Sequence, residues 1–320
     1  MTPTIQILLA TYNGEKFLRE QIDSVLAQQD VSLHILARDD GSTDNTLAIL
    51  REYAQRLPGQ FHLLEDGAGT GNAKWNFIKL TAASTASYVC FCDQDDIWLP
   101  NKVSRSLALM RELEAKHTTA VPMLVFTDLV VIDEAGAAIL PSFWQRDQID
   151  PEAINQLNIL IGHNVVTGCT AMLNRRCADL TLRMPDDSPM HDRWAGLIVA
   201  CMGNGAFLPD KLVRYRQHGG NVIGAPLEKV NFWTKLRWPK TPEKRLEQWW
   251  INQRVAAALL STYPNEMPAS SRNILETYVR IGREPNRWLR VYLLLRHNLL
   301  RNGLRRKLST LWDVFNLGIH

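Results

Sequence analysis

The sequence has no long uncharged apolar run and no cysteine spacing of the zinc-binding kind. Among its 320 residues are five cysteines, an odd number, and Cys90 and Cys92 alternate with Phe91 in an apolar run. No stretch reaches the roughly 18–20 apolar residues of a membrane-spanning helix. The start, MTPTIQILLA, lacks the charged flank and long apolar region of a signal peptide. We therefore expect a cytoplasmic protein with buried, reduced thiols.

The net charge is small, but charged residues are unevenly distributed along the chain. The net charge is +3, but residues 280–320 hold nine basic residues against Glu284 and Asp313, which gives +7 and leaves −4 for the other 279 residues. Such asymmetry points to an anionic partner, either nucleic acid or a membrane surface. No recognised nucleic-acid-binding motif accompanies the basic segment, so we expect no nucleic-acid partner.

Short apolar runs alternate with helical patterns in the first part of the chain. We predict strands at residues 5–10, 33–37, 61–64 and 88–92, and helices at residues 16–28, 45–55 and 72–82. This rhythm predicts an α/β fold with a mostly parallel sheet. Later strands are expected at 125–132, 170–173 and 212–215, with a helix at 194–202. After residue 226 helical patterns dominate, so we predict a catalytic α/β domain at 1–225 and a helical, basic region at 226–320.

Polar clusters follow the predicted strands, where sheets of this kind bind ligands. Asp93, Asp95 and Asp96 come directly after the fourth strand. Carboxylates this close repel one another unless a cation lies among them, and oxygen ligands suit Mg²⁺ or Mn²⁺. The competing interpretation is a solvated acidic turn.

Two earlier strands end in Tyr12 and in the pair Asp39 and Asp40. Tyr12 could stack on a nucleotide base, and one of the carboxylates could accept a hydrogen bond from it. The alternative is a plain Asp-Gly turn in which Ser42 caps the next helix.

A glycine-rich stretch, LLEDGAGTG at residues 63–71, is similar to the cofactor loop of methyltransferases that use S-adenosylmethionine. Such a loop normally follows the first strand of its domain, whereas here two βα units precede it, so a flexible surface loop explains it better. Lys74, which follows, could contact phosphate, but we expect a solvated lysine.

Five motifs together resemble family-2 glycosyltransferases. These are ILLATYNG at 7–14, RDDGSTD at 38–44, FCDQDDIWLP at 91–100, MHDRW at 190–194 and YRQHGGN at 215–221, and the last two resemble a bacterial rhamnosyltransferase-like subgroup. The resemblance implies a GT-A fold, a nucleotide-sugar-binding mixed sheet, and inversion at the anomeric carbon. It also implies the site residues: Thr11, Tyr12 and Asp39 for the nucleoside, Asp93 for the ribose or donor sugar, Asp95 for the metal (Mn²⁺ or Mg²⁺), Asp192 as the catalytic base, and His218 facing the metal or diphosphate.

The sequence departs from this family at the base, where the usual Glu-Asp pair is His191-Asp192. The Gln-x-x-Arg-Trp signature of processive synthases is also absent. Both favour transfer of a single sugar. By resemblance the donor is dTDP-rhamnose or else a UDP-hexose, and the acceptor a saccharide or a lipid-linked precursor in surface polysaccharide synthesis. Asp192 could instead cap a helix, His218 could be an exposed loop histidine, and the fold could serve as a non-catalytic binding module.

The segment from Arg280 to Lys307 combines nine cations with dense apolar and aromatic residues between residues 288 and 295. Because Arg290 and Arg296 interrupt the apolar run, it is too short to span a membrane. We expect it to place the enzyme on the inner, anionic face of the cell membrane. Packing against the catalytic domain and a homodimer interface are the alternatives.

Overall fold

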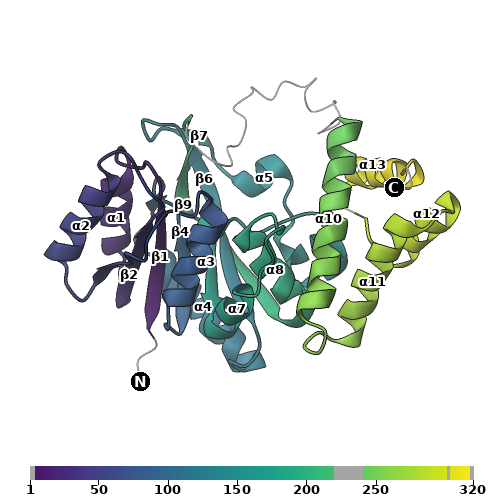
Figure 1. The fold of residues 1–320 in the computed structure, drawn as a ribbon, viewed down its shortest axis with the longest axis horizontal. Coiled ribbons are helices and arrows are strands. Elements are labelled where there is room, and N and C mark those ends of the chain that lie inside the picture. Colours follow the sequence, from purple (N-terminus) through teal and green to yellow (C-terminus); the bar gives the residue numbers. More distant parts are fainter. Residues whose placement is uncertain (1–3, 220–240, 301–302, 318–320) are drawn as a thin grey trace.

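The computed structural model describes residues 4–219, 241–300 and 303–317, and a mixed sheet forms the centre of this part (Figure 1). Its strands are β1 (Ile5–Thr11), β2 (Leu33–Asp39), β3 (Phe61–Leu63), β4 (Tyr88–Cys92), β5 (Ile97–Trp98), β6 (Met123–Ile132), β7 (Ala138–Leu140), β8 (Met172–Asn174) and β9 (Asn204–Arg216). The order across the sheet is β3-β2-β1-β4-β8-β6-β9-β5, and β7 pairs with β6.

Helices cover both faces of the sheet. They are α1 (Leu18–Leu26), α2 (Thr46–Arg56), α3 (Ala73–Ala83), α4 (Lys102–His117), α5 (Phe143–Asp147), α6 (Leu157–Leu160), α7 (Arg175–Thr181), α8 (His191–Met202), α10 (Pro242–Thr262), α11 (Ala269–Arg283), α12 (Arg287–Arg296) and α13 (Leu304–Phe315), with two 3-10 turns, η1 (Pro151–Asn155) and η2 (Gly168–Thr170). No helix in the described ranges is both long and apolar enough to cross a lipid bilayer.

Strands β1 to β4 form the parallel half of the sheet. Ile5 of β1 pairs with Leu33 of β2 on one side and with Tyr88 of β4 on the other, and both pairings are parallel. The carboxyl ends of these strands therefore meet along one edge, as the alternating pattern predicts. The expected strands and helices of this half are all present, with ends shifted by a few residues.

Alternate residues of the central strand enter different cores. Ile7 and Leu9 belong to the core that packs under α1, α2 and α4. Leu8 and Ala10 belong to the second core, which α3, α7, α8 and the C-terminal helices complete. Both faces of β1 are thus covered, which explains why its sequence is a continuous apolar run rather than an alternating one.

The other half of the sheet is mixed. β8 runs antiparallel to both β4 and β6, and β9 runs parallel to β6. The short β5 lies antiparallel to the end of β9, with Ile97 opposite Arg214. The segment that follows β4 is thereby held beside the end of β9. This pairing brings the acidic motif at residues 93–96 close to His218, which follows β9. The expected α/β, mixed-sheet fold is confirmed.

Several elements differ from the sequence prediction, and the short elements β5, β7, α5, α6 and α7 were not predicted. The sequence interpretation did not include α4, β9 covers thirteen residues instead of residues 212–215, and α8 begins at His191 rather than at residue 194. Because Met190 is the N-cap of α8, Asp192 lies in the first helical turn and is not the capping residue.

The C-terminal helices share a core with the sheet. Trp249, Tyr278 and Leu294 belong to the same apolar cluster as Leu8. The indole N–H of Trp194 on α8 donates to the Tyr263 hydroxyl at 3.2 Å. The predicted division at residue 225 falls among residues 220–240, which lie outside the described residues, and it stays a prediction.

Candidate active site

Thr11 and Asp39 end two neighbouring strands and bond to each other. The Thr11 hydroxyl donates to Asp39 Oδ1 at 3.0 Å, and Asp39 Oδ2 accepts the backbone N–H groups of Gly41 and Ser42 at 3.1 and 2.8 Å. The turn interpretation expected Ser42 to cap α2, but the N-cap is Asn45. The Ser42 hydroxyl instead donates to Asp39 and accepts from the Asn13 N–H. Asp39 therefore organises the turn at the predicted nucleoside site.

Tyr12 presents its ring to solvent with 56% of its surface exposed. Its backbone is held by Gln94, whose side-chain oxygen accepts the Tyr12 N–H at 2.8 Å and whose amide donates to the Tyr12 carbonyl at 2.9 Å. Gly14 makes this possible, because a Cβ there would lie 2.2 Å from Gln94 Oε1. Gln94, which sequence analysis did not single out, thus locks the end of β1 to the acidic loop and leaves an aromatic face free for stacking.

The acidic loop between β4 and β5 holds three aspartates in different surroundings. Asp95 Oδ2 lies 2.8 Å from Nε2 of His218, which follows β9. Asp96 is fully buried, and its Oδ1 accepts the backbone N–H of Arg216 at 3.1 Å. Asp95 and His218, 123 positions apart, are therefore brought together as the resemblance implies.

The aspartates influence one another's ionisation. Burial, followed by the negative charges of Asp95 and Asp192, raises the pKa of Asp93 to about 7. Burial also raises the pKa of Asp95, an effect that the imidazole of His218 opposes. Carboxylates forced together in this way favour a bound cation, which would relieve the repulsion.

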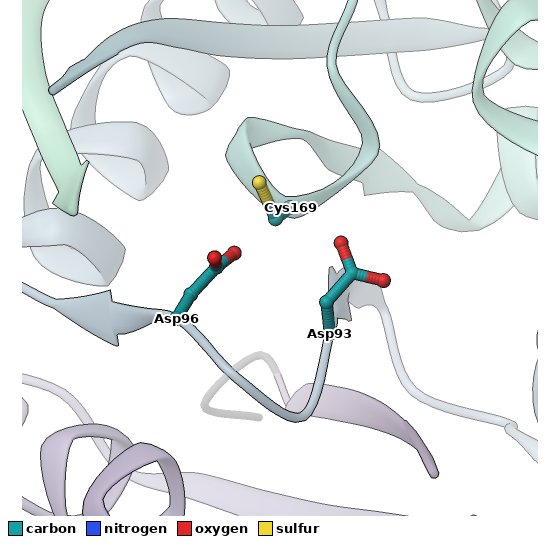
Figure 2. Close-up of side chains that lie close together, drawn as sticks. All are labelled: Asp93, Asp96 and Cys169. Carbon is teal, nitrogen blue, oxygen red and sulfur yellow. The ribbon is translucent and has the colours of Figure 1, made fainter. Parts of the chain in front are cut away.

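Asp93, Asp96 and Cys169 form a second cluster of groups that could hold a metal ion. Oxygens of Asp93 and Asp96 and the sulfur of Cys169 lie within 4.8 Å of one another, and Figure 2 shows the two carboxylates extending from the loop on either side of Cys169. Burial and the charge of Asp96 raise the pKa of Cys169 well above its usual value, so this thiol keeps its proton. The sequence carries no signal for Cys169, because its proximity depends on the pairing of β4 with β8.

Arg216 holds the loop in place. Its guanidinium donates to the Asp95 carbonyl at 2.9 Å and to Glu20 at 2.6 Å, and it stacks over the Phe17 ring. His218 packs against the same ring, with centroids 4.9 Å apart. The position of the imidazole is thus set by α1 as well as by β9.

Asp192 lies in the first turn of α8 and is only partly accessible. Its Oδ2 accepts a hydrogen bond from the backbone N–H of Gly168 at 3.1 Å, and its Oδ1 accepts one from the backbone N–H of Arg193 at 2.6 Å. Burial raises the pKa of Asp192 to about 6, although these two N–H groups oppose the shift. A carboxylate with such a pKa can take up a proton near neutrality, which is what a general base does.

His191 is not a polar partner of this carboxylate. Its ring stacks on Phe77 with centroids 4.2 Å apart and meets Phe91 edge-on at 4.5 Å. Burial lowers the pKa of His191 to about 3, so the imidazole is neutral. The residue that replaces the family's usual glutamate therefore serves as apolar packing beneath the helix start.

Lys74 and the glycine-rich loop have structural partners. Lys74 is buried, contrary to expectation, and its ammonium donates to the carbonyls of Asp186 and Ser188 at 2.5 and 2.7 Å. A Cβ at Gly69 would lie 2.0 Å from the Asp40 carbonyl oxygen, and Asp40 Oδ2 accepts the Thr70 hydroxyl. Close contact with Asp40, rather than with a cofactor, explains the glycine at position 69.

The strand-end carboxylates, the exposed Tyr12 ring and Asp192 gather at the carboxyl edge of the parallel strands, where α/β sheets bind their ligands. Residues 6–180 match the sequence family described as glycosyl transferase family 2. The dTDP-rhamnosyl transferase RfbG of Shigella flexneri is 39% identical over 229 residues, which cover 68% of this chain and 74% of that protein. The chain belongs to glycosyltransferase family 2 and is a glycosyltransferase.

Solved structures agree on the fold. The chain superposes on TarS of S. aureus with a TM-score of 0.57 at 15% identity, covering 98% of this chain and 53% of that one. It therefore spans about half of that TarS chain. A mannosyltransferase of Pyrobaculum calidifontis, solved with GDP-Man and Mn²⁺, superposes with a TM-score of 0.50 at 17% identity, covering 98% of this chain and 88% of that one.

Proposed function

We propose that this chain transfers one sugar from a nucleotide-sugar donor to an acceptor hydroxyl with inversion at the anomeric carbon. The observation that carries the proposal is the meeting of three groups at one edge of the sheet. These are the Asp95–His218 pair, Asp93, and Asp192, whose charge acts on Asp93. The methyltransferase alternative has no such support, because Gly69 and Thr70 are occupied by Asp40.

Asp95 and His218 are the proposed metal ligands. One carboxylate oxygen and one imidazole nitrogen suit Mn²⁺, and Mg²⁺ would depend more on the carboxylates and water. The two atoms lie 2.8 Å apart, so both are near enough to hold one ion. A bound ion would neutralise the charge that develops on the diphosphate leaving group.

The protein groups have separate tasks. The Tyr12 ring stacks on the base, and Thr11 and Asp39 hold the nucleoside end. Asp192 accepts the proton of the acceptor hydroxyl while the oxygen forms a bond to C1 and the bond from C1 to the diphosphate oxygen breaks. Neutral His191 adds no charge beside Asp192, which keeps that carboxylate free to take the proton.

The proposed donor is dTDP-rhamnose, supported by the name of the Shigella flexneri relative. A UDP-hexose is the second candidate, since TarS has also been solved with UDP-GlcNAc, and that structure superposes with a TM-score of 0.55. The proposed acceptor is a saccharide or lipid-linked precursor of a surface polysaccharide. The proposed location is the cytoplasm, in peripheral contact with the membrane.

A donor screen tests the proposal. Purified protein is incubated with dTDP-rhamnose, UDP-glucose, UDP-GlcNAc or GDP-mannose, each with Mn²⁺ or Mg²⁺, and release of the nucleoside diphosphate is measured with and without saccharide acceptors. We expect turnover of dTDP-rhamnose that Asp192→Asn abolishes. Lack of turnover with every donor, although nucleoside diphosphates bind, would favour a non-catalytic binding module.

A further inference from the structure

The last two helices, α12 and α13, expose large apolar side chains. Among the described residues, seven large hydrophobic side chains are exposed, and five of them lie on these two helices: Trp288, Tyr292, Leu295, Leu308 and Trp312. We refer to these five residues as the hairpin face. Because so large a share of the exposed apolar surface is gathered on two short helices, it is not random scatter.

The spacing places these residues in stripes. Trp288, Tyr292 and Leu295 are four and three positions apart on α12, and Leu308 and Trp312 are four apart on α13. Residues at this spacing share one side of a helix. Leu293 and Leu294 on α12 and Val314 on α13 are buried instead, so each helix has an inner and an outer side.

The two stripes join into one surface. The Trp288 ring meets the Phe315 ring edge-on, with centroids 5.0 Å apart. Arg290 donates to the carbonyls of Val314 and Leu317 at 3.3 and 2.8 Å. The start of α12 therefore lies against the end of α13. The two helices form a helical hairpin, which lies at the end of the molecule opposite α1 and α2 (Figure 1).

Positive charge surrounds the hairpin face. Arg287, Arg296 and Lys307 are exposed, and Arg296 donates to the Tyr292 hydroxyl at 2.6 Å. Asp313 is the single acidic residue in the sequences of α12 and α13, and it is buried in an ion pair with Arg245 at 2.9 Å. The exposed charge of the hairpin is thus of one sign.

We propose that the hairpin face binds an anionic lipid surface, with the two tryptophans at the depth of the headgroups and the cations against the lipid phosphates. Aromatic side chains combined with Lys and Arg are suited to this interface. Helices of ten and twelve residues extend roughly 15–18 Å, which is too short to span a bilayer, so the hairpin lies in the interface plane.

A second copy of the chain fits this surface less well. A two-fold contact would bring the cations of both copies together, while the only carboxylate of either hairpin is already buried against Arg245. Like charges placed together in this way oppose association. The inference concerns binding alone and does not depend on sugar transfer.

The test is vesicle co-sedimentation of the full chain. Vesicles are made of phosphatidylcholine alone or of equal parts phosphatidylcholine and phosphatidylglycerol, at low and high salt. We expect binding to the anionic vesicles, weakened by salt because salt screens exposed charges. Phosphatidylcholine vesicles should bind much less.

Two sets of substitutions separate the charges from the apolar face. Arg287→Gln, Arg296→Gln and Lys307→Gln together should weaken binding on the order of 100-fold, at ~1 kcal/mol per cation. The matched control replaces exposed cations elsewhere: Arg111→Gln, Lys116→Gln and Arg176→Gln. Leu308→Ser with Trp312→Ser should weaken binding about tenfold or more through lost apolar burial, and Ile139→Ser on β7 is the control.

Point substitutions are preferable to removal of the segment, because truncation would strip Arg245 of its buried partner. Thermal melting checks that each variant is folded. Absence of binding to anionic vesicles at low salt overturns the proposal, as does binding that both substitution sets leave unchanged. A dimer in solution that Leu308→Ser with Trp312→Ser dissociates, without vesicle binding, would assign the face to a second copy instead.

Discussion

The proposed donor side and the proposed acceptor side of the site hold their carboxylates differently. Asp95 lies against the imidazole of His218, among two other aspartates, whereas Asp192 accepts two backbone N–H groups at a helix start. Burial raises the pKa of both carboxylates. In the proposed mechanism the raised pKa values have two different consequences: at Asp95 a bound cation would relieve the crowding of carboxylates, and at Asp192 the carboxylate can take up a proton near neutrality.

The largest effect is expected from Asp95→Ala. If the donor side is a metal site, the loss removes several kcal/mol of charge stabilisation, and turnover should fall on the order of 10³-fold. Chelation of the divalent ion should have the same effect on the parent, and Mn²⁺ or Mg²⁺ should restore activity. The matched control is Asp179→Ala, an exposed aspartate on α7. Full activity of the parent in excess chelator would show that transfer does not need a metal and that Asp95 is not a metal ligand.

The next effect is expected from Asp192→Asn. The amide keeps an oxygen that can accept the Gly168 N–H but cannot take the acceptor's proton. Turnover should drop by ~10²-fold or more while donor binding persists, measured as kcat against the donor's dissociation constant. Asp187→Asn, an exposed position in the loop before α8, serves as the control. A variant that turns over like the parent would show that Asp192 is not the base.

His218→Ala sharpens the donor side of the comparison. We expect the half-saturating concentration of Mn²⁺ to rise about 10–100-fold, with turnover recovered at high Mn²⁺, because Asp95 remains. Titration of activity against Mn²⁺ provides the measurement. An unchanged metal requirement would assign His218 to the diphosphate or to packing against Phe17.

The pH dependence isolates the acceptor side. The base must be deprotonated, and burial raises the pKa of Asp192 to about 6. With the metal saturating, kcat/KM should therefore fall about tenfold per pH unit below about pH 6 and level off above about pH 7. The raised pKa also means that the folded state takes up a proton more readily than the unfolded chain. Asp192→Asn should accordingly be no less stable than the parent above about pH 6. A flat profile down to about pH 5 would contradict the assignment.

The parallel half of the fold was predictable because its information is local. Each strand from β1 to β4 is a short apolar run followed by its own helix, so periodicity alone locates it. Helix α4 was predictable too: Val103, Leu107 and Met110 follow a helical spacing that the sequence interpretation passed over. The thirteen residues of β9 were not, since they contain Pro209 and Asp210 and owe their strand conformation to pairing with β6.

For the candidate site, the sequence indicated the residues more readily than it indicated their surroundings. The motifs named Asp95 and His218, and the pairing of β5 with β9 is what joins them. Nothing in the sequence distinguishes Lys74 as buried, because its partners are backbone carbonyls 112 and 114 positions away. Gln94 was not predicted as a site residue because it lies between Asp93 and Asp95, whose carboxylates are the more obvious candidates for binding. Its role depends on hydrogen bonds to the backbone of Tyr12, 82 positions away.

The contact between Gly14 and Gln94 couples these two positions over evolution. A Cβ at position 14 would lie 2.2 Å from Gln94 Oε1, so an alanine there would displace the Gln94 side chain from its two hydrogen bonds to Tyr12. A change at position 94 that loses the same two hydrogen bonds would in turn leave position 14 free to vary. Because residues in contact do not contribute additively, the two positions should drift as a pair, and a double-mutant cycle on them should show coupling of about 0.5–3 kcal/mol.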